Sequence, residues 1–150
     1  MKKFCLVLAV LTIFALLVTG CTKKENNEDA AAAVEFNYRT AEEVKGNIEN
    51  NDDIILLDIQ PEEGWNEHHI KGAMATHAFP VETDEDKAKL DAVMSDLEAS
   101  ENPIVIVCPR GGKGAERTYA YLLEKGIKEE RLFILEKGQE GWPYDELLEK

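Results

Sequence analysis

From residue 34 onward, apolar residues occur in short runs and in helical spacing. Two continuous apolar runs, residues 54–57 and 104–107, are typical of strands that are buried on both faces of a parallel sheet. Residues 34–38 alternate between apolar and polar positions, which favours a half-buried strand. The predicted strands are residues 34–38, 54–57, 73–79, 104–107 and 131–135.

Helix signals separate these strands. Thr40 and Glu43 have the spacing of a capping box, and Pro61 suits the first turn of a short helix. The predicted helices are residues 41–49, a short helix beginning near Pro61, and residues 84–97, 115–125 and 142–148. Strands that alternate with helices predict an α/β fold, with a parallel sheet and helices on both of its faces.

Residues 1–20 have the layout of a secretory signal peptide. Lys2 and Lys3 precede an apolar stretch over residues 4–18, and small residues follow. The pentapeptide Leu-Val-Thr-Gly-Cys that ends at Cys21 resembles the bacterial lipobox, in which the Cys receives diacylglycerol and becomes the N-terminus after cleavage. An uncleaved membrane anchor is the alternative interpretation.

Two acyl chains hold a protein on a membrane stably, whereas one chain does so only marginally. We therefore expect a lipoprotein anchored through Cys21 on the extracytoplasmic face of the cell membrane. Residues 21–33 are polar and then alanine-rich, without apolar periodicity, and predict a flexible tether. Residues 34–150 have the length of one domain.

The charge of the chain restricts its partners. The formal net charge is −13, and residues 1–20 carry two lysines and no acidic residue, so the remainder has a formal charge of −15. Such an acidic chain argues against nucleic-acid binding, and against attachment to anionic lipids through a basic patch. The membrane contact is therefore expected through the lipid.

Cys108 is the candidate catalytic residue. It ends the apolar run 104–107, and Pro109 favours an extended backbone before it. The following loop is rich in glycine and leads into the helix predicted from Ala115, so backbone N–H groups are expected to surround and stabilise a thiolate. The basic residues Arg110, Lys113 and Arg117 lie close by in the sequence.

Other interpretations of this segment are weaker. Free Cys is commonly buried and inert, but the glycines and the three basic residues favour a functional thiol. The segment lacks the Gly-x-x-x-x-Gly-Lys-Ser/Thr order of a P-loop and the Gly-x-Gly-x-x-Gly order of a dinucleotide site. Asp58 follows the other buried run, so both residues are expected at the carboxyl edge of the sheet, where ligands bind.

Three parts of the sequence resemble the motifs of a rhodanese domain. Leu-Asp-Ile-Gln-Pro-Glu-Glu at residues 57–63, with a tryptophan and then His-Ile-Lys-Gly-Ala at residues 69–73, is similar to the family's Asp-x-Arg and Gly-His-Ile-x-Gly-Ala motifs. Residues 107–113 are similar to its active-site loop, and residues 135–142 to its closing Gly-Gly-x-x-x-Trp region. The resemblance spans residues 34–148.

The resemblance implies a sheet of about five parallel strands and a sulfurtransferase without a cofactor. The thiolate of Cys108 takes sulfur from a small anionic donor such as thiosulfate, becomes a persulfide, and passes the sulfur to cyanide or to an external thiol. Asp58, His69 and Arg117 are candidate supporting residues. The candidate substrate-binding residues are Arg110, Gly111, Gly112, Lys113, Gly114 and Ala115.

The chain departs from the family pattern in three places. Gln60 replaces the usual Arg, His68 replaces a Gly, and the Cys108 loop is one residue longer than in ordinary single-domain members. A long loop resembles the phosphatase and arsenate-reductase branch, which places an Arg six positions after the Cys to bind the oxyanion. Gly114 occupies that position, so this enzyme class ranks second. A non-catalytic module that binds or senses sulfur species is the third interpretation.

The histidines do not predict a metal site. His68 and His69 are adjacent and point in different directions on a short helix, and no third ligand is evident in the sequence. The motif position of His69 implies a structural role, so no metal is expected.

Overall fold

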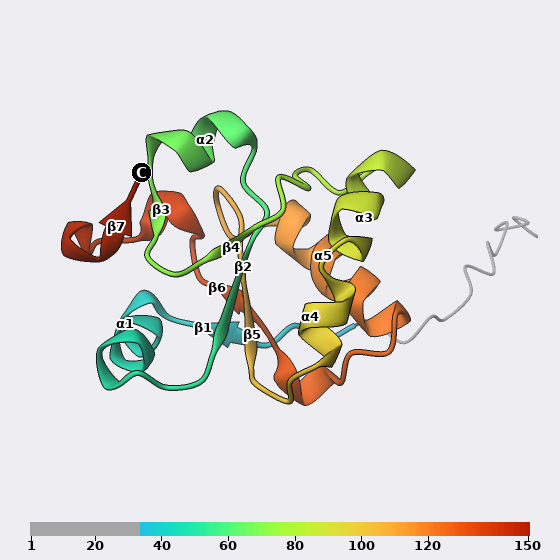
Figure 1. Cartoon of the computed structure of the whole chain (residues 1–150), viewed down its shortest axis with the longest axis horizontal. Coiled ribbons are helices and arrows are strands. Elements are labelled where there is room, and N and C mark those ends of the chain that lie inside the picture. The colour runs from blue at the N-terminus through green and yellow to red at the C-terminus, as the bar shows by residue number, and fades with distance from the viewer. Residues whose placement is uncertain (1–33) are drawn as a thin grey trace, which may run out of the picture. The chain divides into compact units, whose positions relative to one another are not determined.

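The computed structural model describes residues 34–150. The predicted signal peptide, the tether and Cys21 lie outside the described residues. Five parallel strands make the main sheet in the order β1-β6-β5-β2-β4, which confirms the predicted α/β fold (Figure 1). These strands are β1 (Tyr38–Arg39), β2 (Ile55–Asp58), β4 (Met74–Ala75), β5 (Ile104–Val107) and β6 (Leu132–Leu135).

A second, antiparallel pair joins β3 (His69–Ile70) to β7 (Leu148–Glu149). The α-helices are α1 (Ala41–Asn50), α2 (Glu62–Glu67), α3 (Asp84–Asp91), α4 (Met94–Glu98) and α5 (Lys113–Glu124). Single 3₁₀ turns occur at Glu129–Arg131, Gln139–Gly141 and Asp145–Leu147. No helix in residues 34–150 combines the length and the apolar character needed to cross a membrane.

The strand residues alternate between two hydrophobic cores, one on each face of the sheet. In β5, Ile104 and Ile106 belong to the core that α3, α4 and α5 cover, whereas Val105 and Val107 belong to the core that contains Val44 of α1. All four residues of β5 are fully buried. The continuous apolar run 104–107 therefore marks a strand covered on both faces, as the sequence predicted.

The start of α1 confirms the capping box. The Thr40 hydroxyl accepts a hydrogen bond from the N–H of Glu43 at 3.2 Å, and the Glu43 carboxylate accepts one from the N–H of Thr40 at 2.8 Å. The bond from the N–H of Thr40 lowers the pKa of Glu43, and so does a bond from the Thr40 hydroxyl at 2.9 Å, because both favour the charged carboxylate.

Two predicted strands are shorter than expected. Regular pairing in the first is confined to β1 at Tyr38–Arg39, although the Asn37 carbonyl still accepts a hydrogen bond from the N–H of Ile134 at 2.8 Å. The predicted strand 73–79 is regular only in β4. There the Thr76 hydroxyl bonds to the carbonyl of Asp58 at 3.0 Å, and His77 adopts a left-handed backbone that ends the extended segment.

The predicted helix 84–97 is wrong as a single element, because it is divided into α3 and α4. The N–H of Val93 donates to the carbonyl of Leu90 three residues back, at 3.1 Å, which tightens and ends α3. Leu90, Met94 and Leu97 nevertheless all reach the same core, which explains the helical spacing in the sequence.

The predicted helix 142–148 is also wrong. Pro143 disfavours a helical backbone at Trp142, which is extended. The Trp142 indole N–H instead donates to the carbonyl of Tyr144 at 2.9 Å, and Leu148 pairs with Ile70 in the small sheet. Only the turn Asp145–Leu147 is helical, and its form is 3₁₀.

Candidate active site

Cys108 lies at the carboxyl end of β5, the middle strand of the sheet. Its neighbouring strands are β6 on one side and β2 on the other. The side chain is 1% exposed and packs with the core beneath α5. It nevertheless lines a pocket of about 380 Å³ together with the loop that follows it. The thiol therefore occupies the base of the pocket.

One backbone amide contacts the sulfur directly. The N–H of Gly111 donates to Sγ of Cys108 across 3.0 Å. Gly111 has a φ of +68°, and a Cβ there would lie 2.7 Å from the carbonyl oxygen of Leu135, so the turn requires glycine. A donated N–H favours negative charge on the sulfur.

Helix α5 begins at Lys113, two residues before the predicted start at Ala115. The N–H of Glu116 donates to the carbonyl of Gly112 at 3.1 Å, so the amides of the first turn precede the first helical hydrogen bond. Gly112, Lys113 and Gly114 line the pocket. The helix N-terminus therefore lies at the pocket, as the sequence predicted for stabilising an anion.

Ala115, predicted to bind substrate, does not line the pocket. It is fully buried in the core below the loop.

The turn after β6 fixes the Cys108 loop from behind. The N–H of Gln139 donates to the carbonyl of Cys108 at 2.8 Å, and the N–H of Glu140 donates to the carbonyl of Pro109 at 2.9 Å. Gly138 has a φ of +58°, and a Cβ there would overlap the Cys108 carbonyl oxygen and the Gly111 amide. The closing motif of the sequence thus positions the thiol loop.

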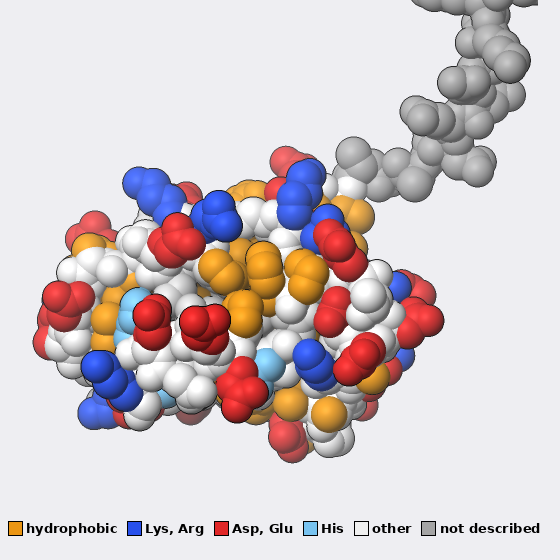
Figure 2. Space-filling model, turned by 90° about the horizontal axis from the view of Figure 1, so that it is seen from above, with side chains coloured by type: hydrophobic (Ala, Val, Ile, Leu, Met, Phe, Trp, Pro, Cys, Tyr) orange, Lys and Arg blue, Asp and Glu red, His pale blue; other side chains and the backbone are white. Residues whose placement is uncertain are grey.

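The opposite wall of the pocket comes from the segment between β4 and α3. Phe79, Pro80 and Glu82 line the pocket from this side. These residues were not predicted as part of the site, because Phe79 ends a predicted strand and nothing in the local pattern connects residues 79–82 to Cys108. Viewed from above, hydrophobic side chains lie near the middle of the surface, with basic and acidic side chains interspersed around them (Figure 2).

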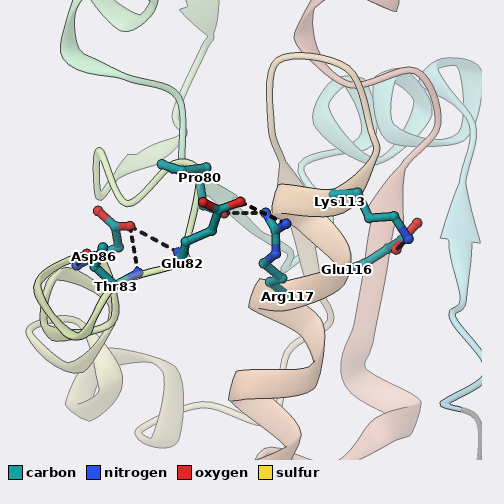
Figure 3. A network of polar contacts seen from close by, with 7 residues as sticks. All are labelled: Pro80, Glu82, Thr83, Asp86, Lys113, Glu116 and Arg117. Atoms are coloured by element: carbon teal, nitrogen blue, oxygen red, sulfur yellow. Dashed lines mark hydrogen bonds and ion pairs between the residues drawn. The ribbon is translucent and has the colours of Figure 1, made fainter.

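Arg117 connects the two walls of the pocket. Its guanidinium donates to the carbonyl of Pro80 at 3.1 Å and pairs with the Glu82 carboxylate at 2.8 Å, as Figure 3 shows. The Asp86 carboxylate in turn accepts from the backbone N–H groups of Glu82 and Thr83, at 3.0 and 3.1 Å. Arg117 therefore holds a segment that is also fixed at the start of α3.

The other two predicted basic residues also have acidic partners. Lys113 lies 3.1 Å from Glu116 on the same helix, and Arg110 lies 3.5 Å from Glu140 (Figure 3 shows the first pair). Lys113 and Arg110 are 81% and 78% exposed, so both point mainly into solvent at the mouth. The three predicted basic residues are thus brought together at the pocket, each beside a carboxylate.

Asp58 lies at the same edge of the sheet but is completely buried. One carboxylate oxygen accepts from the backbone N–H of Gln60 at 2.7 Å, and the other accepts from the Gln60 side-chain amide at 3.1 Å. Burial raises the pKa of Asp58 to about 6, and the two hydrogen bonds from Gln60 oppose this rise. An Arg at position 60, as in the family pattern, would form an ion pair near Asp58. The uncharged Gln60 makes hydrogen bonds to the Asp58 carboxylate instead.

Asp58 lines neither the thiol pocket nor the neighbouring pocket of about 300 Å³ at Gln60, Gly64 and Gln139.

His69 lies apart from the thiol pocket. Its ring stacks on Trp65 with centroids 3.5 Å apart, and Nδ1 lies 3.0 Å from the Trp65 carbonyl oxygen. Nε2 lies 3.7 Å from the carboxylate of Glu149 on β7. These contacts join α2, β3 and β7. In residues 34–150, no three His, Cys, Asp or Glu side chains gather to hold a metal ion.

The position of Gly114 bears on oxyanion chemistry. A Cβ there would lie 2.8 Å from a ring carbon of Phe79, so the wall is closed to a larger side chain. Of the arginines near the pocket, Arg117 is held by Pro80 and Glu82, and Arg110 is 78% exposed beside Glu140. The Cys108 loop therefore has no guanidinium at position 114 that could bind an oxyanion beside the sulfur.

Comparison with solved structures identifies the fold. The rhodanese-like domain of a protein from Anabaena sp. is 20% identical, with a TM-score of 0.59, and the match covers 77% of this chain and 80% of that one. A Bacillus halodurans protein is 21% identical, with a TM-score of 0.56 and coverage of 75% and 76%. The As-Sb reductase of Leishmania major is 18% identical, with a TM-score of 0.56 and coverage of 76% and 85%.

A search of curated proteins finds no match. The profile of the rhodanese-like domain matches residues 40–144, which contain every element from α1 to the turn after β6, and the Cys108 loop with them. The chain therefore belongs to the rhodanese-like domain family.

Proposed function

We propose that this protein is a sulfurtransferase that carries sulfane sulfur as a persulfide on Cys108. The observation that carries the proposal is the Gly111 N–H, which lies 3.0 Å from Sγ at the base of an open pocket. A thiolate is the nucleophilic form of Cys, and a donated amide hydrogen bond together with the start of α5 favours it. A persulfide anion would be stabilised by the same groups.

The transfer has two steps. The Cys108 thiolate attacks the outer sulfur of a donor such as thiosulfate, a sulfur–sulfur bond forms at Cys108, and sulfite leaves with the electron pair of the broken bond. An acceptor such as cyanide or a thiolate then attacks the outer sulfur of the persulfide, and the Cys108 thiolate is regenerated. No external oxidant or reductant is consumed.

The acceptor is external to the domain. Cys108 is the one cysteine in residues 34–150, so no second thiol of the domain can attack the persulfide and form an internal disulfide. The pocket is open to solvent, which suits an external thiol or cyanide.

Intact mass spectrometry tests the first step. After incubation with thiosulfate and removal of small molecules, the protein should gain one sulfur atom, and cyanide should remove it with formation of thiocyanate. Cys108→Ser is the matched control, because it keeps the size of the side chain and removes the nucleophile. Equal gain of sulfur by the control, or no gain by the wild type with any sulfane donor, contradicts the proposal.

A Cys-dependent phosphatase or arsenate reductase remains the alternative that the experiments must separate. The likeness to the Leishmania major reductase lies in the fold, at 18% identity. Gly114 and the Phe79 ring leave no room for an oxyanion-binding Arg at that position. We expect no turnover of aryl phosphates or arsenate; turnover that is lost in Cys108→Ser would favour the alternative.

We also propose attachment to the extracytoplasmic face of the cell membrane through a lipid on Cys21. The support is the sequence of residues 1–21, with two lysines, an apolar stretch and Leu-Val-Thr-Gly-Cys. In cells supplied with labelled palmitate, the full-length protein should incorporate the label and sediment with membranes. Cys21→Ala should remove the label, and an unlabelled wild type would contradict the proposal.

A further inference from the structure

The mouth of the thiol pocket combines three cations with three carboxylates. Arg117 pairs with Glu82 at 2.8 Å, Lys113 with Glu116 at 3.1 Å, and Arg110 with Glu140 at 3.5 Å. The formal charge of these six side chains is therefore zero. These six side chains therefore present no net positive charge to an incoming anion. A net positive charge would strengthen the binding of a small dianion.

Of the three carboxylates, one belongs to the lining of the thiol pocket and two lie outside that lining. Glu82 lines the pocket itself, beside Cys108 and Arg117. Glu116 is on α5 one turn below Lys113, and its side chain is 26% exposed (Figure 3). Glu140 follows the Gln139 amide that bonds to the Cys108 carbonyl, so it lies on the turn that fixes the loop. Each carboxylate weakens the attraction of its partner for a second anion.

Apolar side chains contribute to the lining of the thiol pocket from both sides. Phe79 and Pro80 lie on the facing wall and Pro109 follows the thiol, whereas Gly112 and Gly114 contribute backbone. A ring and two prolines favour contact with a hydrocarbon group over contact with a hydrated sulfonate oxygen.

Resting on the proposed sulfurtransferase function, we propose that Glu82, Glu116 and Glu140 are specificity-determining residues. They select donors whose sulfur carrier bears an apolar group and a single negative charge, and they disfavour the inorganic dianion thiosulfate. Phe79, Pro80 and Pro109 receive the apolar group, while the Cys108 thiolate attacks the outer sulfur.

An alkanethiosulfonate isolates this preference. Methanethiosulfonate anion has a methyl group where thiosulfate has one oxyanion, and it presents the same outer sulfur. Attack by the Cys108 thiolate forms the same persulfide and releases methanesulfinate in place of sulfite, with the bonding electrons leaving on the sulfinate. Both reactions conserve charge, so the two donors differ in the carrier and not in the chemistry at Cys108.

The experiment compares the apparent KM of the two donors at saturating cyanide, for the wild type and for Glu82→Gln, Glu116→Gln and Glu140→Gln, singly and combined. Glutamine keeps the shape of each side chain and removes its charge. The matched control is Glu101→Gln, because Glu101 pairs with Lys128 at 2.8 Å before the start of β5, away from the carboxyl edge. Persulfide loading by mass is recorded for every variant.

We expect the wild type to have the lower KM for methanethiosulfonate. In the triple variant at low ionic strength, the KM for thiosulfate should fall about tenfold and that for methanethiosulfonate about threefold, because a dianion feels the removed charges twice as strongly. The difference should shrink at high salt, which a purely structural effect of the substitutions would not do.

Three outcomes overturn the inference, and they separate its failure from failure of the proposed function. Sulfur loading of Cys108 by both donors, with the same KM ratio in the wild type and the triple variant, contradicts the selectivity and leaves the sulfurtransferase proposal intact. Absence of loading by either donor contradicts both. An equal change of the ratio in Glu101→Gln would show that total charge, and not the mouth, sets the preference.

Discussion

Cys108 and Asp58 end neighbouring strands at the same edge of the sheet, but their surroundings differ. Asp58 pairs in register with Val107, one residue before Cys108. The thiol opens onto a pocket of about 380 Å³ and receives one amide hydrogen bond. The carboxylate lines neither this pocket nor the neighbouring one at Gln60, and Gln60 occupies both of its oxygens.

This difference shows that position at the carboxyl edge does not by itself make a reactive group. Parallel strands deliver both side chains to the place where ligands bind in such folds. Access then depends on the segments that cross the edge: the loop 109–112 leaves Cys108 at the base of a pocket, whereas Gln60 folds back over the carboxylate. We therefore infer a chemical role for Cys108 and a structural role for Asp58.

The strongest test of this difference removes the Cys108 thiol in one variant and the Asp58 carboxylate in another. Cys108→Ser should abolish sulfur transfer completely, because no other thiol exists in residues 34–150. Asp58→Asn should retain transfer within about tenfold of the wild type, since a positioning group acts on the loop only indirectly. Steady-state formation of thiocyanate measures both, and equal loss in the two variants would remove the distinction.

A smaller effect is expected from the turn that fixes the thiol loop. Gly138→Ala places a methyl group against the Cys108 carbonyl in a left-handed backbone, and should lower the free energy of unfolding by about 4 kcal/mol. Gly72 also has a positive φ, but nothing lies within 4 Å of a Cβ there, so Gly72→Ala should cost only about 1 kcal/mol.

Urea denaturation compares the two glycine variants. Similar losses of stability would mean that backbone conformation alone, and not contact with the Cys108 loop, makes Gly138 necessary.

The buried carboxylate should appear in the pH dependence of stability. Burial raises the pKa of Asp58 from its ordinary value of 3.8 to about 6, so the folded protein binds this proton more tightly than the unfolded chain does. The stabilisation is complete below about pH 4, is lost as the pH rises to about 6, and amounts to about 3 kcal/mol.

The difference in unfolding free energy between the wild type and Asp58→Asn isolates this group from the other carboxylates. We expect the wild type to lose stability relative to the variant between about pH 4 and 6, with no further change above that range. A constant difference across this range would show that Asp58 titrates normally in the folded protein.

The smallest effect concerns His69, which does not line the thiol pocket. His69→Ala removes the stack on Trp65 and the contact with Glu149, and should lower the free energy of unfolding by about 2 kcal/mol. Sulfur transfer should stay within about twofold of the wild type, because His69 does not line the thiol pocket. A large loss of turnover in a stably folded variant would give His69 a part in the reaction.

Local patterns predicted the elements that depend on local chemistry. The runs 54–57 and 104–107 became buried strands, since four consecutive apolar residues suit a strand covered on both faces. The Thr40 capping box began α1, because its two hydrogen bonds involve residues three apart. Predicted elements were wrong where contacts between residues far apart in the sequence decide the structure. An example is the pairing of Leu148 with Ile70, which replaces the predicted last helix.

The candidate site likewise has parts that follow from the local sequence and parts that depend on contacts between distant segments. The sequence by itself determined the thiol, the glycines after it and the helix that follows, because these lie within one short segment. The turn after β6 then fixes the position of the loop. The tertiary structure alone decided that Phe79, Pro80 and Glu82 form the facing wall, and that Glu82 and Glu140 accompany Arg117 and Arg110 at the mouth. These features join segments far apart along the chain, so their spacing carries no local signal, and only packing against the sheet brings them together.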